Sequence, residues 1–140
     1  MPFPYVTAAA AALIIILQIL LMLSAGMHRA KTKVGVGVAG DIDLERKVRR
    51  HGNLAENTGL FLVVLALLEM MGTAETPMIW FAGLFVTARL LHAIGFSSLA
   101  GSHMGEGSKL FMVARVLGAM GTAFLGLGLG GFLVYSLLQY

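Results

Sequence analysis

The sequence of 140 residues contains no cysteine, only three prolines and only 12% charged residues. The lack of cysteine excludes disulfide bonds and thiolate-ligated metals. The scarcity of proline permits long uninterrupted helices, because proline breaks a helix interior. So few charged residues leave too little polar surface for a globular domain of this length, which argues against a soluble protein.

Hydrophobic residues dominate instead, at 58% of the chain with a mean hydropathy of +0.86. They gather in apolar runs of roughly 20 residues, the length that an α-helix needs to cross a hydrocarbon core of about 30 Å. The runs predict an all-α integral membrane four-helix bundle, a single domain over residues 1–140, with helices at about 6–27, 45–71, 78–96 and 110–138.

The basic residues flank the apolar runs. A net charge of +3 could indicate nucleic-acid binding, but eight of the ten Lys and Arg lie in or beside the first and third connections. By the positive-inside bias, these connections are cytoplasmic and both termini lie on the non-cytoplasmic side. The first run has basic residues only after it, the reverse of a signal peptide, so it stays as an anchor. The short termini and loops suggest a bacterial inner membrane.

Two glycine patterns have different readings. Gly35, Gly37 and Gly40 in "GVGVAGD" match the letters of a dinucleotide-binding fingerprint. Because a membrane helix and not a strand is predicted before them, we interpret the segment as a flexible loop. Gly126 and Gly130 lie four residues apart in the last apolar run, a spacing that predicts close helix packing within or between subunits.

Polar residues recur along one face of the second predicted helix, at intervals of four, four and three residues: Glu45, Arg49, Asn53 and Glu56. Further polar residues of the other predicted helices lie in the same cytoplasmic half: Arg29, Arg89, His92 and Arg115. A charged group at the centre of a membrane helix costs about 2.5 to 3.5 kcal/mol on insertion scales. Their common depth therefore indicates a pocket.

Structural readings compete with this one. Arg29 and Arg49 could snorkel to lipid head groups, Glu45 could pair with Arg49, and Glu56 could neutralise an arginine between helices. A structural reading of this kind, snorkelling or ion pairing, is preferred for three other basic residues: Arg46, Lys47 and Arg50. A functional reading is preferred for the deep groups, because four polar groups at one level are costly without a ligand: Asn53, Glu56, Arg89 and Arg115.

The segment "ERKVRRHGNLAENTGLFL" resembles the signature of the MAPEG family, the membrane-associated proteins in eicosanoid and glutathione metabolism. The family pattern, approximately Glu-Arg-x-x-Arg-x-His-x-Asn-x-x-Glu before an apolar run, is met by six residues: Glu45, Arg46, Arg49, His51, Asn53 and Glu56. The likeness extends over nearly the whole chain, through an Arg-x-x-His in the third apolar run and an Arg early in the fourth.

The resemblance implies a homotrimer with glutathione as co-substrate, bound between neighbouring subunits near the cytoplasmic face, and no metal. Asn53 and Glu56 would contact glutathione and Arg29 would hold one of its carboxylates, while Arg115 would be the catalytic residue that stabilises the thiolate. The remaining members of the binding set are Arg49, Arg89 and His92. A lipophilic small molecule or lipid would enter from the bilayer as the second substrate.

Departures from the family pattern argue against a close eicosanoid synthase. Gly52, Phe96 and Val116 stand where the eicosanoid-forming members carry Arg, Tyr and Ser, and Ala119 supplies no hydroxyl in their place. The leading hypothesis is therefore a glutathione-dependent transferase or peroxidase that acts on hydrophobic electrophiles.

Two alternatives stay open. One is a non-catalytic scaffold of the same fold that binds or presents a lipid. The other is a small channel or proton-coupled transporter that would use Glu56, Arg89 and His92 as a polar path. The second is disfavoured because the polar residues cluster in one half of the bundle, and the outer half offers only Glu69 and Glu75 near its rim.

Overall fold

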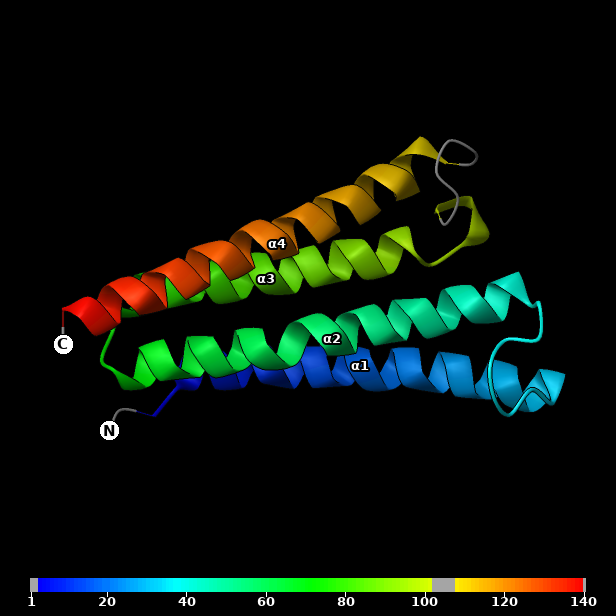
Figure 1. The fold of residues 1–140 in the computed structure, drawn as a ribbon, viewed down its shortest axis with the longest axis horizontal. Coiled ribbons are helices and arrows are strands. Elements are labelled where there is room, and N and C mark those ends of the chain that lie inside the picture. Colours follow the sequence, from blue (N-terminus) through cyan, green and yellow to red (C-terminus); the bar gives the residue numbers. More distant parts are fainter. Residues whose placement is uncertain (1–2, 102–107, 140) are drawn as a thin grey trace.

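The structure, a computed structural model, describes residues 3–101 and 108–139. In these residues the chain forms four α-helices and one short 3-10 turn: α1 (Tyr5–Thr32), α2 (Ile42–Met70), α3 (Glu75–Gly95), η1 (Leu99–Gly101) and α4 (Lys109–Leu138). The helices alternate in direction along one long axis (Figure 1). Both termini lie at one end of the bundle, which we call the terminal end. The α1–α2 and α3–α4 connections lie at the other end, which we call the basic end.

Each α-helix is long and apolar enough to cross a membrane. The shortest, α3, has 21 residues and is therefore about 31 Å long, close to the thickness of the hydrocarbon core. Large apolar side chains cover much of the outside, for example Leu60 and Leu127, each 75% exposed in the single chain. The protein is an integral membrane protein with four spans, as the apolar runs predicted.

The first connection is shorter than the polar sequence between the apolar runs suggested. α1 continues to Thr32, and α2 begins at Ile42 because the Asp41 carboxylate accepts a hydrogen bond of 2.9 Å from the Leu44 backbone N–H. This bond and one from His28 hold the pKa of the Asp41 carboxyl below its usual range, so the cap is ionised at neutral pH. The glycine-rich segment follows a helix and forms a loop.

The terminal end is closed by a carboxylate from a different helix. Pro4, the residue before α1, offers no side-chain cap. Glu69, near the end of α2, accepts hydrogen bonds from the backbone N–H of Val6 at 2.8 Å and of Thr7 at 3.0 Å. The Thr7 hydroxyl donates a third, at 2.9 Å. A negative charge at a helix N-terminus satisfies its free N–H groups and its dipole, so Glu69 fixes α1 against α2.

α3 and α4 approach each other most closely at two glycines. A Cβ on Gly95 would lie 2.5 Å from the backbone nitrogen of Arg115, and one on Gly118 would lie 2.5 Å from the Ala88 carbonyl oxygen. Gly126 and Gly130, where the sequence predicted close packing within or between subunits, have no such neighbour within 4 Å among the described residues. Of the two alternatives, packing between subunits therefore stays a prediction.

Candidate functional site

A cavity of about 640 Å³ lies between α2 and α4, which run parallel. Its size falls in the range of small-molecule sites. Its polar part lies toward the basic end and is lined by Asn53, Glu56, Asn57, Arg89 and Thr122. Its apolar part extends toward the terminal end, between α2 and α4, and is lined by Leu60, Phe61, Val64, Ala123, Leu127 and Leu129.

The polar part is organised around a buried cation. Arg89 of α3 is only 1% exposed, and its Nη1 donates to the Thr122 hydroxyl at 3.0 Å. Its Nη2 donates to Asn53 Oδ1 at 2.8 Å. The Thr122 hydroxyl in turn donates a hydrogen bond to the Gly118 carbonyl oxygen at 2.7 Å. Because Oδ1 of Asn53 faces the guanidinium, its Nδ2 is the end of the amide that can donate to a ligand.

The predicted stripe on α2 divides into two parts. Glu45 and Arg49 form an exposed pair, with Arg49 Nε 3.0 Å from Glu45 Oε1, as one of the structural readings proposed. Asn53 and Glu56 instead line the cavity. Within the described part of the chain, the Glu56 carboxylate has no hydrogen-bond or ion-pair partner, so it does not neutralise an arginine there. Arg49 lies one helical turn from Asn53, toward the basic end.

Arg115 lies at the same edge of the cavity on α4. It precedes Ala119, a cavity residue of the next turn, by four positions. Its guanidinium carbon is 4.8 Å from the centre of the Phe96 ring, a cation–π contact. The His92 ring lies 5.1 Å from the same ring, but His92 is 4% exposed and does not line the cavity. Arg49 and Arg115 are not among the residues that line the cavity, and each precedes a lining residue by one helical turn, Asn53 and Ala119 respectively.

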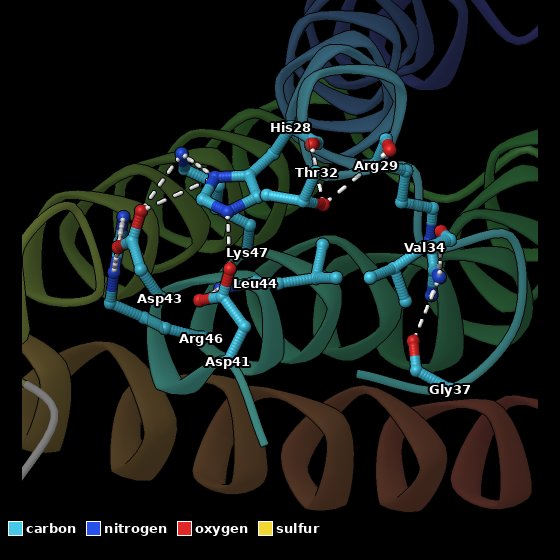
Figure 2. Close-up of polar contacts among 10 residues, drawn as sticks. All are labelled: His28, Arg29, Thr32, Val34, Gly37, Asp41, Asp43, Leu44, Arg46 and Lys47. Atoms are coloured by element: carbon cyan, nitrogen blue, oxygen red, sulfur yellow. Dashed lines mark hydrogen bonds and ion pairs between the residues drawn. The ribbon is translucent and has the colours of Figure 1, made fainter. Parts of the chain in front are cut away.

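Arg29 serves the first connection in this chain. Its Nη1 donates to the carbonyl oxygens of Gly37 at 2.8 Å and Val34 at 3.3 Å, so it holds the glycine-rich loop against the end of α1 (Figure 2). The structure therefore brings Asn53, Glu56 and Arg89 together in one cavity. The other predicted site residues are not among those that line it: Arg29, Arg49, His92 and Arg115.

Two of the basic residues given a structural reading, Arg46 and Lys47, form ion pairs within the protein. Arg46 is 7% exposed and Lys47 Nζ lies 2.9 Å from Asp43 Oδ2, in a cluster that also contains His28 (Figure 2). The ion pairs of Arg46 and Lys47 with Asp43 agree with the structural reading preferred for these residues. The spacing of Asp43, Arg46 and Lys47, three and four residues apart, would have indicated these ion pairs once the start of α2 at Ile42 was known.

Comparisons with known proteins agree with this architecture. Residues 7–128 match the sequence profile of the MAPEG family. The inner membrane protein YecN of Escherichia coli strain K12, and that of Escherichia coli O6:H1, are each 36% identical to the chain over 69 residues, which are 49% of this chain and 52% of the relative. The chain thus spans about half the length of the curated relatives it matches. Because the family match covers nearly the whole of the four-helix fold, the chain belongs to the MAPEG family.

Proposed function

We propose that the protein is a glutathione-dependent transferase or peroxidase that acts on hydrophobic or lipid electrophiles. The observation that carries the proposal is the arrangement around the α2–α4 cavity. Asn53 and Glu56 offer a donor and an unpaired carboxylate on one wall, and Arg115 lies one turn beyond the opposite wall. The MAPEG family, which includes glutathione transferases, makes this chemistry the first to test.

The chemistry of glutathione fits these groups. Glutathione carries two carboxylates, one ammonium and one thiol. In the proposal Glu56 binds the ammonium and Asn53 Nδ2 donates to a carboxylate. Arg115 faces the sulfur and lowers the thiol pKa from its ordinary value of about 8.5, which raises the fraction of nucleophilic thiolate at neutral pH. The thiolate then forms a C–S bond with an electrophilic carbon and displaces a leaving group or a π-electron pair that takes up a proton. Alternatively it attacks the outer oxygen of a hydroperoxide, which breaks the O–O bond and releases an alcohol, and a second glutathione converts the sulfenic acid to the disulfide and water. No protein nucleophile is required.

The other predicted residues enter the proposal in different ways. Arg49, at the edge of the cavity, supplies a second cation for the carboxylates. Arg89 acts through the Asn53 amide, and His92 supports the Phe96 ring on which Arg115 lies. Arg29 is held by its own loop and would reach glutathione only in the site of a neighbouring copy. This is consistent with a homotrimer whose glutathione sites lie between subunits.

The apolar part of the cavity is the proposed place of the second substrate. Leu60 and Leu127 line it and are widely exposed in the single chain, so it opens sideways. A lipid-soluble substrate could therefore enter from the bilayer or from the interface with another copy. In the proposal the basic end faces the cytoplasm of a bacterial inner membrane, where glutathione is available, and both termini lie on the other side.

The alternative is a scaffold that binds a lipid without chemistry. It is favoured by the missing hydrogen-bond donors: Phe96, Val116 and Ala119 have apolar side chains where a ligand hydroxyl or thiolate could otherwise be held. The cavity fits both functions. The two functions differ in whether the protein binds glutathione and ionises its thiol.

Titration of the detergent-purified protein with glutathione separates the two functions. We expect binding by calorimetry and an ultraviolet thiolate band, which Arg115→Ala abolishes while the oligomer stays intact. Lys109→Ala is the matched control, because Lys109 is an exposed cation in the first turn of the same helix. An equal thiolate band in Arg115→Ala and the parent would remove Arg115 from the mechanism. Absence of glutathione binding would favour the scaffold.

A further inference from the structure

We propose that Arg46 is a positioning residue for Arg115, which it holds in place through the backbone and ring of Phe96. The inference rests on the proposed function for its catalytic consequence, but the mechanical link between the two arginines can be tested without glutathione. Arg46 is not among the residues to which the proposed function gives a role.

Hydrogen bonds on two edges hold the Arg46 guanidinium in place. Its Nε and Nη2 donate to Asp43 Oδ1 at 2.9 and 2.6 Å, and its Nη1 donates to the carbonyl oxygen of Phe96. The residue is 7% exposed, so these bonds are shielded from water. A planar guanidinium held by a carboxylate on one edge and a carbonyl on another has little freedom to move. Arg46 therefore fixes the backbone at Phe96.

Phe96 is the C-cap of α3 and directly follows its last residue. At this end of a helix, free carbonyl groups carry the negative end of the helix dipole. A cation there satisfies a carbonyl that the helix leaves unpaired, which is a physical reason for Arg46 to be buried instead of reaching the lipid head groups. The bond joins residues 50 positions apart in the sequence. It therefore ties the first turns of α2 to the end of α3.

Phe96 in turn contacts Arg115. The Arg115 guanidinium lies over the Phe96 ring at 4.8 Å from its centre. The residue before Phe96, Gly95, meets the Arg115 backbone so closely that an added Cβ would be 2.5 Å from its nitrogen. A shift of the end of α3 would therefore move both the ring under the guanidinium and the backbone beside it.

The anchor of Arg46 is itself fixed to α1. Lys47 Nζ donates to Asp43 Oδ2 at 2.9 Å and to His28 Nδ1 at 2.7 Å, and His28 Nε2 lies 2.8 Å from the Asp41 carboxylate (Figure 2). The chain of contacts thus runs from α1 through α2 and α3 to the proposed catalytic arginine on α4.

A fluorescent reporter tests the link in the absence of any ligand. Trp80, the single tryptophan, is replaced by Phe, and Phe96→Trp places an indole under Arg115. Arg115→Ala should change the indole emission maximum, because the cation leaves the ring. Arg46→Ala should reproduce most of that change, and adding it to Arg115→Ala should change little more. Emission unaltered by Arg46→Ala would overturn the proposal.

The catalytic consequence is tested by the pKa of bound glutathione. Arg46→Ala should raise the pKa of the bound thiol by about one unit. At pH values below that pKa, the thiolate fraction should then fall by about tenfold. Arg46→Lys, which keeps one donor for the Phe96 carbonyl, should recover part of the loss. Lys31→Ala, which removes an exposed cation at the same end, should have no effect.

The outcomes separate a positioning role from a structural one. Loss of folded protein alone would leave the pKa of glutathione bound to the remaining fraction unchanged, and that result would contradict the proposal. If the parent forms no thiolate, the proposed function fails, and the fluorescence experiment alone decides whether Arg46 positions Arg115.

Discussion

Arg89 is a buried cation whose Nη1 and Nη2 donate to two neutral oxygens, while its buried Nε has no hydrogen-bond partner among the described residues. The described residues place the Thr122 hydroxyl and the Asn53 carbonyl against it and no carboxylate within ion-pair distance. Burying an unpaired charge is unfavourable, so its retention suggests a function beyond stability. In the proposed function, the guanidinium selects one orientation of the Asn53 amide and leaves its N–H groups for a ligand.

This assignment predicts the effect of Asn53→Asp. The new carboxylate can still accept from Arg89 and would neutralise it, so we expect the melting temperature in detergent to stay the same or rise. It cannot donate to a ligand carboxylate and would repel it. The affinity for glutathione should therefore fall by at least about tenfold, or about 1.4 kcal/mol, in calorimetry. Unchanged affinity would mean that Asn53 binds no carboxylate of glutathione.

Sequence and structure differ most at the level of single side chains. The helical spacing of Asn53 and Glu56 was sufficient to place them on one face, and both line the cavity. The bond from Arg46 to Phe96 was not predictable, because its acceptor is the backbone carbonyl of the residue that follows the last residue of α3. A sequence pattern reports side chains at fixed intervals, and it carries no information on which carbonyl groups a helix end leaves free.

At the scale of helices, apolar runs of about 20 residues were enough to predict four spans, because only helices satisfy their backbone within a bilayer. The helix ends were less predictable. The Asp41 cap starts α2 before the signature segment, and Glu69 from α2 caps α1. The Asp41 cap is a local contact with a residue three positions on, whereas the Glu69 cap joins residues 63 positions apart and depends on a tertiary contact that the periodicity of one helix does not contain.

The α3–α4 contact yields a prediction at the same scale. Gly118→Ala would place a methyl group 2.5 Å from two backbone atoms of α3, the Ala88 oxygen and the His92 nitrogen, neither of which can rotate away. We expect a loss of stability of about 1 to 3 kcal/mol, seen as a lower melting temperature. Gly131→Ala, with nothing within 4 Å, should be neutral or stabilising. Equal melting temperatures of the two variants would contradict the α3–α4 packing.

At the scale of the whole molecule, one chain leaves its cavity only partly walled. Glu56 and Leu60 line it and are exposed, and Leu127 faces outward from the other side. A carboxylate beside an open apolar surface at this depth is unfavourable against lipid alone. A neighbouring copy that covers the opening, as in the proposed homotrimer, would remove this exposure and complete the site with its own cations.

The proposed glutathione site also requires one orientation in the membrane, and the absence of native cysteine makes this simple to test. Lys33→Cys places a thiol in the first connection at the basic end, and Glu75→Cys places one at the terminal end, where α3 begins. Since basic connections stay in the cytoplasm, a membrane-impermeant maleimide should label Glu75→Cys in intact spheroplasts and Lys33→Cys only after permeabilisation. The parent protein should stay unlabelled in both conditions. The reverse pattern would place Asn53, Glu56 and Arg115 toward the outer side, away from cytoplasmic glutathione, and would exclude the proposed reaction in that compartment.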